Sequence, residues 1–592
     1  QLEDFQKKLW LKKKFVAGCH YLITLDHLNE AQVQAALENP KQTTQWKILF
    51  NVNTSGLNAV ELCKNYPHLV VDTSLFEPKF QADVLREIEH LDDKTNGLLI
   101  HSDNFQALNL LQERYKEQVK CIYIDPPYNT GNDGFIYKDS YQHSSWLSLL
   151  DSRVNNAKGL LSQEGLFICS IDDKEQHYMK SILSENFGIN NFIAQIIWER
   201  AYSPVNLKKH FSESHDYIFF YSKDIDSLIC NGLPRTEIGN NRYSNPDNDP
   251  RGEWKSSDLS VGPAVISNIY EIITPTGRKV LPPSGYSWRL NKERLQEYID
   301  DNRIWFGKDG DNVPSIKRFL SEVKGTITPM TIWKYQDVGH SQSASQDLKK
   351  MFNEARFTYP KPVPLIKQAI NLYSNNNSVI LDYFAGSGTT AHAVMQLNTE
   401  DGGNRQWICV QLPEQTSEKS EAFKAGYTNI ADIARERIRR AGAKIRTDFA
   451  DKLAEREKPL DLGFRSYSVG ESNFKPWNEM VTDPEEIRQQ MLDIIDPIEP
   501  DVTDESILTE LLLKRGISPM AGVEDRGAYL FVPSASLAIR LAPNLTEAEF
   551  SEILASGAQT ILLLSRSLGT NETLRINLAL QAEQQGVRVE VV

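Results

Sequence analysis

Two consecutive prolines, Pro126 and Pro127, end an apolar run at residues 121–124. The run indicates a buried strand, which the prolines cannot continue because proline has no backbone N–H and a fixed φ. The motif therefore presents Asp125 and Tyr128 at the carboxyl end of a strand, where open α/β sheets bind ligands. A flat substrate with an exocyclic amine, such as an extruded adenine or cytosine, would suit a ring that stacks and a carboxylate that accepts N–H bonds. The alternative is a simple strand-ending turn in which Asp125 caps a helix and Tyr128 packs at the surface.

A second turn, rich in glycine, lies further along the chain. Residues 379–392 read Val-Ile-Leu-Asp-Tyr-Phe-Ala-Gly-Ser-Gly-Thr-Thr-Ala-His, which predicts a strand, a turn and the start of a helix. Gly386 and Gly388 allow close approach of a ligand or a positive φ, and Thr389 or Thr390 could cap the helix. The turn is not a P-loop, because the Gly-Lys-Ser/Thr ending is missing, and it lacks the full Gly-x-Gly-x-x-Gly dinucleotide pattern.

Together, Asp-Pro-Pro-Tyr and Phe-Ala-Gly-Ser-Gly-Thr-Thr resemble the motifs of amino-methyltransferases that use S-adenosylmethionine (AdoMet) to modify exocyclic amines of DNA bases. In that family the first motif holds the flipped base and the glycine turn holds the methionine part of AdoMet. Here Phe384 follows Tyr128 by 256 positions. This order resembles the β-type permutation, in which the insertion between the motifs is the target-recognition domain.

The resemblance implies site residues at the matching positions, with AdoMet as cofactor and no metal. The catalytic residues would be Asp125, Pro126, Pro127 and Tyr128; the cofactor-binding residues would be Asp103, Lys361, Pro362, Asp382, Phe384, Ala385, Gly386, Ser387, Gly388, Thr389, Gln411 and Glu414. The Asp125 carboxylate and the Pro126 carbonyl would accept the amine N–H bonds, while Tyr128 stacks on the base.

The other implied contacts concern the cofactor. Lys361 and Pro362 would lie over the AdoMet carboxylate, and Asp103 and Asp382 would contact its amino group, adenine or ribose. Each of these two aspartates could instead be a helix cap, and Phe384 could pack in the core. The family often has an acidic residue where this chain has Gln411, so either Gln411 or Glu414 could contact the ribose.

More narrowly, the chain resembles the modification (Mod) subunit of type III restriction–modification systems. The similar stretches include residues 100–104, 125–131, 143–147, 170–173, 213–217, 245–254, 288–289, 339–352, 433–440 and 571–577. The resemblance implies adenine-N6 methylation of double-stranded DNA, a homodimer, and a separate restriction subunit, since no helicase P-loop or clear nuclease motif is visible. Adenine is expected because Asp-Pro-Pro-Tyr favours adenine in the family and Ser-Pro-Pro-Tyr favours cytosine. An N4-cytosine methyltransferase and a non-catalytic DNA-recognition subunit are the alternatives.

Strands that alternate with helices from residue 97 onward predict an α/β fold with a largely parallel, doubly wound, Rossmann-like sheet. The expected domains are an N-terminal domain (1–90), the catalytic half of the methyltransferase domain (91–202), a target-recognition domain (203–350), the AdoMet-binding half (351–465), an acidic linker (466–505) and a C-terminal α/β interaction domain (506–592).

A net charge of −14 argues against a nucleic-acid partner, but the charge is unevenly distributed. Residues 451–592 hold 13 Lys and Arg against 24 Asp and Glu, a balance of −11, which leaves only −3 for the other 450 residues. The insertion carries a recurring basic and aromatic set that could grip phosphates and read base edges, or could be ordinary surface charge. DNA therefore remains a plausible partner.

The remaining features point to a cytoplasmic location. No apolar run approaches the ~20 residues of a membrane span, and no signal peptide is visible. The six cysteines form no Cys-x-x-Cys pair, which favours buried thiols in a reducing compartment over a zinc site or disulfides. Because the chain begins at Gln1 without Met, we expect a truncated N-terminus.

Overall fold

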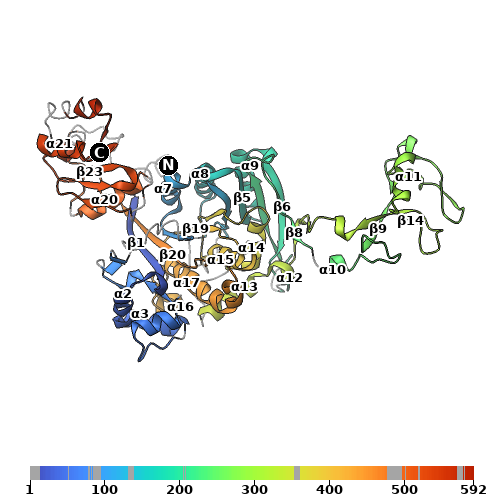
Figure 1. Cartoon of the computed structure of the whole chain (residues 1–592), viewed down its shortest axis with the longest axis horizontal. Helices are drawn as coiled ribbons and strands as arrows, with labels where there is room; N and C mark the ends of the chain where they lie inside the picture. Colours follow the sequence, from blue (N-terminus) through green and yellow to red (C-terminus); the bar gives the residue numbers. More distant parts are fainter. Residues whose placement is uncertain are drawn as a thin grey trace. The chain divides into compact units, whose positions relative to one another are not determined.

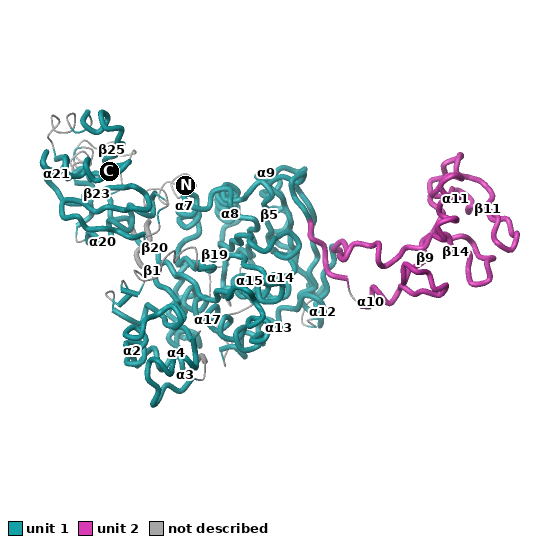
Figure 2. Tube along the Cα trace, viewed as in Figure 1, with its two compact units in different colours: residues 1–229, 331–592 teal, residues 230–330 magenta. Residues whose placement is uncertain are grey.

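Figure 1 presents a computed structural model of the chain. It describes residues 14–50, 52–67, 69–77, 80, 81, 83, 84, 95–130, 139, 141–204, 206, 209–235, 237–352, 360–475, 488, 496–500, 502–515, 517, 521–569, 578 and 580–592. Gln1–Ile229 and Thr331–Val592 form one compact unit, unit 1, and Cys230–Met330 form another, unit 2 (Figure 2). The Mod-like stretch at 571–577 and the start of the predicted Lys-Pro motif, residues 357–359, lie outside the described residues.

Unit 1 is built on an 11-stranded sheet. In spatial order its strands are β17 (Ile332–Trp333), β6 (Phe192–Glu199), β7 (His215–Ser222), β5 (Leu161–Ile171), β4 (Val119–Ile124), β18 (Val379–Asp382), β19 (Gln406–Gln411), β3 (Gly97–His101), β20 (Phe464–Glu471), β1 (Lys14–Thr24) and β2 (Val70–Asp72). From β5 to β20 all neighbours are parallel. Antiparallel pairs, β5–β7 and β20–β1, flank this centre. The predicted α/β fold with a largely parallel sheet is confirmed, and the edge pair β17–β6 is parallel as well.

Two groups of helices pack along this centre. One group is α7 (Asn104–Tyr115), α8 (His143–Leu160) and α9 (Gln176–Phe187); the other is α14 (Val363–Asn371), α15 (Thr389–Asp401) and α17 (Ile430–Asp448). Further helices of this unit are α12 (Tyr335–Val338), α13 (Ser341–Phe352), α16 (Glu421–Lys424) and α18 (Ala450–Ala454). The helix predicted to open at residues 103–104 is α7, whose first turn Asp103 caps by accepting from the Phe105 N–H at 2.9 Å.

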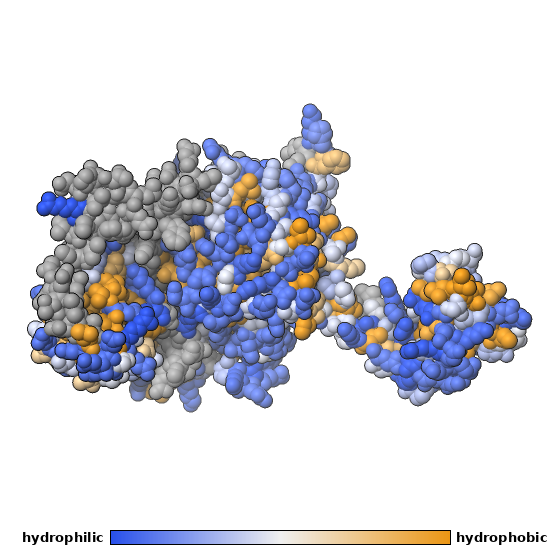
Figure 3. Space-filling model, turned by 90° about the horizontal axis from the view of Figure 1, so that it is seen from above, coloured by the Kyte–Doolittle hydropathy of each residue, from blue (hydrophilic) through white to orange (hydrophobic). Residues whose placement is uncertain are grey.

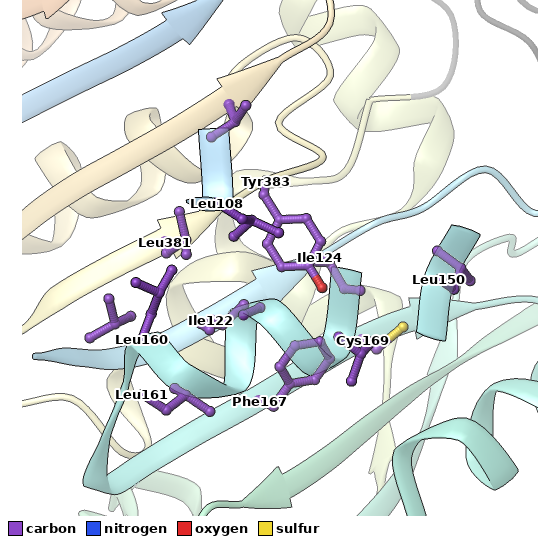
Figure 4. Close-up of a cluster of buried hydrophobic side chains, with 14 of the residues drawn as sticks. Leu108, Ile122, Ile124, Leu150, Leu160, Leu161, Phe167, Cys169, Leu381 and Tyr383 are labelled. Atoms are coloured by element: carbon purple, nitrogen blue, oxygen red, sulfur yellow. The ribbon is translucent and has the colours of Figure 1, made fainter. Parts of the chain in front are cut away.

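Burial on both faces explains why the central strands are mostly apolar rather than alternating. In β4, Ile122 and Ile124 belong to the main hydrophobic cluster together with residues of α7 and α8 such as Leu108 and Leu150 (Figure 4). Cys121 and Tyr123 point to the opposite face and are also buried. A sheet covered on both faces is typical of parallel α/β proteins.

The N-terminal segment extends the same sheet, and the C-terminal residues form a second one. α2 (Glu30–Glu38), α3 (Pro40–Phe50) and α4 (Ala59–Asn65) pack beside β2 around a buried Trp46. The second sheet has the order β21 (Glu524–Asp525), β22 (Leu530–Val532), β23 (Leu537–Arg540), β24 (Thr560–Leu563) and β25 (Arg588–Val591), with α20 (Asp504–Leu513), α21 (Glu547–Leu554) and α22 (Ser565–Leu568). β20 runs past residue 466, where the acidic linker was expected to begin.

Unit 2 corresponds to the middle of the segment 203–350. Its chain starts and ends in one antiparallel pair, β8 (Leu233–Pro234) with β16 (Thr326–Ile327). Between them lie α10 (Glu237–Asn240), β9 (Trp254–Asp258), β10 (Ser260–Val261), β11 (Ile272–Ile273), β12 (Lys279–Val280), β13 (Ser287–Trp288), α11 (Lys292–Asp300), β14 (Ile304–Trp305) and β15 (Ser315–Phe319). A core around Trp288 and Leu259 holds them together.

The visible face of both units is mostly hydrophilic, with smaller apolar groups between the polar side chains (Figure 3). Within the described part of the chain, no helix has the length and hydropathy needed to cross a membrane.

Candidate active site

The carboxyl ends of four neighbouring parallel strands meet at one edge of the central sheet. Asp125 follows β4 directly, Asp382 is the last residue of β18, Gln411 is the last residue of β19, and Asp103 comes two residues after β3. The strand order β4-β18-β19-β3 brings these four side chains together although the chain separates them widely. This edge is where ligands bind in open α/β sheets.

The catalytic turn is held rigidly by its neighbours. Pro126 is buried, and the indole N–H of the fully buried Trp146 donates to the Pro127 carbonyl at 2.8 Å. Asn129 then takes a left-handed conformation with φ of 56°, which asparagine tolerates better than most residues. Its side chain accepts from the Tyr141 N–H at 2.7 Å and donates to Glu175 at 2.9 Å. Trp146 and Asn129 therefore fix the direction in which Asp125 and Tyr128 point.

Both glycines of the turn have a positive φ, and Gly388 also lies against a neighbouring helix. Gly386 and Gly388 have φ of 54° and 80°, a region that side chains rarely adopt. The Gly386 N–H donates to the Gln411 side chain at 2.7 Å, so that amide oxygen is committed to the turn. A Cβ at Gly388 would lie 2.9 Å from the Ile438 side chain of α17, so Gly388 permits close helix packing.

A cavity that is open to solvent lies between the two turns. Twelve predicted residues line it: Asp103, Asp125, Pro127, Lys361, Asp382, Phe384, Ala385, Gly386, Ser387, Thr389, Gln411 and Glu414. Four predicted residues do not: Pro126, Tyr128, Pro362 and Gly388. Further lining residues, which the motifs did not indicate, include Asn104, Tyr123, Tyr141, Leu149, Ile366 and Ile430.

Lys361 joins the two predicted sites. Its ammonium group donates to both oxygens of the Asp125 carboxylate, each at 2.7 Å, and lies 4.9 Å from the centroid of the Tyr128 ring. The Tyr128 hydroxyl is buried, and burial together with the nearby Asp125 carboxylate raises its pKa well above its ordinary range. Tyr128 therefore offers a neutral ring whose nearest cation is Lys361.

Two further aspartates that line the cavity, Asp382 and Asp103, have different surroundings. Burial raises the pKa of the Asp382 carboxyl group to about 7, although Thr390 and the Phe384 N–H donate to it. The second carboxylate oxygen of Asp103 lies 3.4 Å from the Arg153 guanidinium group. Both aspartates therefore serve local structure, Asp103 as a helix cap, and still face the cavity.

Arg437 supports the glycine turn and was not indicated by the sequence motifs. It lies on α17, is buried, and donates to the hydroxyl groups of Ser387 and Thr389 at 2.5 Å each. Burial lowers its pKa to about 10, which leaves it charged at neutral pH. The sequence offered only the basic run at residues 435–440, which did not distinguish this inward-facing arginine from its neighbours.

Comparison with known proteins places these motifs in a family. Residues 119–422, just over half of the chain, match the DNA methylase family. The Mod subunit of the type III restriction–modification enzyme StyLTI from Salmonella typhimurium is 32% identical over 419 residues, which cover 65% of this chain and 62% of that protein. The EcoPI Mod subunit of Escherichia phage P1 is 30% identical over 67% of this chain and 69% of that protein. The EcoP15I Mod subunit of Escherichia coli is 29% identical over 71% of this chain and 71% of that protein.

Proposed function

Because this chain belongs to the DNA methylase family, we propose that it transfers a methyl group from AdoMet to the N6 atom of adenine in double-stranded DNA. The observation that carries the proposal is the shared cavity: Asp125, at the end of β4, and the glycine turn, after β18, line the same space. A base-amine site and a methyl-donor site must lie this close for transfer to occur.

The cavity residues fit AdoMet, whose sulfonium and ammonium groups give it a net positive charge. Four carboxyl groups, those of Asp103, Asp125, Asp382 and Glu414, line the space. We assign the methionine part to the turn at residues 385–389 and to Asp382. Gln411 or Glu414 would contact the ribose, since both line the cavity; the Gln411 oxygen also accepts from the Gly386 N–H. When bound, AdoMet supplies an activated methyl group, so the protein contributes mainly position and electrostatics.

The chain's own residues would prepare the amine. An adenine N6 lone pair is delocalised into the ring and is a poor nucleophile. Hydrogen bonds from its two N–H groups to the Asp125 carboxylate and the Pro126 carbonyl would draw the lone pair out of conjugation. The Tyr128 ring would stack on the base, which must leave the duplex to reach the cavity.

Similarity to three Mod subunits supports a role as the recognition and modification subunit of a type III system. We therefore propose a cytoplasmic homodimer that binds DNA and joins a separate restriction subunit. The acidic C-terminal residues repel DNA and would suit a protein partner better.

The test is to treat unmethylated genomic DNA with the purified protein and map modified bases by single-molecule sequencing. N6-methyladenine at a fixed motif is the expected product. Mass spectrometry of the nucleosides identifies N4-methylcytosine, the alternative product, and the absence of any product would favour a non-catalytic recognition subunit.

A substitution at the catalytic turn tests the residue assignment. Asp125→Ala should abolish methyl transfer, because the amine loses its principal acceptor, while AdoMet binding persists. Methylation by this variant at the wild-type rate would contradict the assignment of Asp125.

A further inference from the structure

Lys361 occupies the place that the target base needs. Its side chain is 11% exposed and its ammonium group bonds to both oxygens of Asp125. The same group lies 4.9 Å from the centroid of the Tyr128 ring. The Lys361 ammonium group is therefore bonded to the carboxylate that would accept the base amine. It also lies close to the Tyr128 ring, on which the base would stack.

A base that stacks on Tyr128 and bonds to Asp125 must compete with this ion pair for both groups. The pair is bidentate and partly shielded from water, so it is stronger than an exposed surface pair. Entry of the base is therefore favoured when Lys361 is drawn to another partner, and the natural partner of an ammonium group is an anion.

The cavity itself indicates which anion that is. Among the described residues that line it, Lys361 is the only lysine or arginine, whereas four side chains are carboxylic acids. A ligand carboxylate in this space would find one cationic side chain. The amino-acid end of AdoMet carries such a carboxylate.

We propose that Lys361 is a latch, which holds the base site closed until the carboxylate of the methyl donor draws its ammonium group away from Asp125. This inference rests on the proposed function and adds an order of binding to it. The donor enters first, and its arrival frees Asp125 and Tyr128 for the base. A base is then not held extruded while the cofactor site is empty.

Calorimetric binding measurements on the full chain test the latch without DNA. S-adenosylhomocysteine keeps the amino-acid end and lacks the sulfonium charge, whereas 5′-methylthioadenosine lacks the amino-acid end altogether. Asp125→Asn releases Lys361, so we expect it to bind S-adenosylhomocysteine roughly tenfold more tightly than the wild type. Its affinity for 5′-methylthioadenosine should not change.

A double-mutant cycle isolates the pair. In a Lys361→Met background, Asp125→Asn should no longer strengthen S-adenosylhomocysteine binding. Lys361→Gln repeats the cycle if the methionine variant does not fold. Lys367→Met is the matched control, because Lys367 lies on α14, pairs with Glu400 and is not among the residues that line the cavity.

Unchanged S-adenosylhomocysteine affinity in Asp125→Asn, or an equal gain in the Lys361→Met background, would overturn the latch. These outcomes are separate from the proposed function. A protein that methylates DNA without this coupling refutes the latch alone, and a protein that has the coupling but methylates no base refutes the proposed function alone.

Discussion

Asp125 and Asp382 lie at the carboxyl ends of the neighbouring strands β4 and β18, and they have different partners. Asp125 has an ammonium group on both oxygens. Asp382 is fully buried, is bonded to a hydroxyl and an amide N–H, and has no cation within ion-pair distance among the described residues. Burial consequently raises the Asp382 pKa to about 7, so its charge changes near neutral pH.

This pKa predicts a pH dependence of cofactor binding. An ionised Asp382 attracts the ammonium group of S-adenosylhomocysteine, and the protonated form does not. Affinity should therefore fall by up to roughly tenfold per pH unit as the pH drops below about 7. Binding measured between about pH 6 and pH 8 tests this. Asp382→Asn should bind weakly with no such dependence, and a wild-type curve parallel to that of the variant would contradict the assignment.

The contribution of Asp382 to the free energy of unfolding should fall with rising pH, whereas its contribution to cofactor binding should rise. The folded state raises the Asp382 pKa from 3.8 to about 7, so the folded protein holds this proton more tightly than the unfolded chain. The contribution of Asp382 to the free energy of unfolding is therefore largest below about pH 4 and declines as the pH rises to about 7. Chemical denaturation of the wild type and Asp382→Asn should show a difference that changes over this range. A constant difference would contradict it.

Replacing Arg437 should affect cofactor affinity and thermal stability differently. Arg437→Met keeps the length of the stem and removes the donors to Ser387 and Thr389. S-adenosylhomocysteine affinity should fall roughly tenfold as the turn loosens. Thermal stability should hardly change, since removing a buried charge offsets the lost hydrogen bonds. Unchanged affinity, measured by calorimetry, would show that the turn does not depend on Arg437.

At the scale of elements, α17 explains why a basic run need not be a DNA-binding surface. Its arginines serve the interior: Arg435 donates to Asp72 of β2 at 2.7 Å, Arg437 supports the glycine turn, and Arg440 donates to the Met351 carbonyl at 2.9 Å. The helix thereby ties the N-terminal segment, the cofactor turn and α13 to one scaffold. Basic residues that could contact phosphate must be sought elsewhere.

These contacts also show which features of the site could be predicted from the sequence and which could not. The two turns were predictable because proline and glycine act on their own neighbours, and most lining residues followed from the motifs. The Lys361–Asp125 pair spans 236 positions and the Arg435–Asp72 pair spans 363, and no local pattern encodes such distances. The antiparallel insertion of β7 between β5 and β6 was missed for the same reason, since an apolar strand does not reveal its direction.

In unit 2, the strand pair β9–β15 offers the best candidate phosphate contact. Lys255 and Arg318 are exposed and lie directly opposite each other, where like charges repel unless an anion sits between them. In the same pair, Lys317 is buried and bonded to Asp247, so it is structural.

Replacing both exposed residues by alanine should weaken DNA binding and reduce the slope of log affinity against log salt by roughly two. Fluorescence anisotropy at several salt concentrations measures this. A double substitution of Lys279 and Lys292, which are exposed elsewhere in unit 2, provides the control. An equal loss of DNA affinity in the control would mean that binding depends on the net charge of unit 2 and not on the positions of Lys255 and Arg318.

At the scale of the whole molecule, unit 2 is an insertion with its own core. It holds 14 Lys and Arg against 13 Asp and Glu, a net charge of +1 in a chain whose total is −14. Its first and last strands pair with each other, Leu233 opposite Ile327 and Pro234 opposite Thr326. The points at which the chain enters and leaves unit 2 are therefore adjacent, as expected of a domain inserted into a loop of a complete fold.

This arrangement predicts that unit 1 folds and binds cofactor without unit 2. In a variant in which a short Gly-Ser linker joins Ile229 to Thr331, the affinity for S-adenosylhomocysteine should stay within about twofold of the wild type, because every described residue that lines the cavity lies in unit 1. Methylation at a fixed sequence should be lost, because the module proposed to read the bases is gone. Calorimetry and single-molecule sequencing of treated DNA measure the two properties on the same preparation. Sequence-specific methylation by the shortened chain would show that the recognition residues lie in unit 1, and loss of cofactor binding would show that the insertion is part of the fold it interrupts.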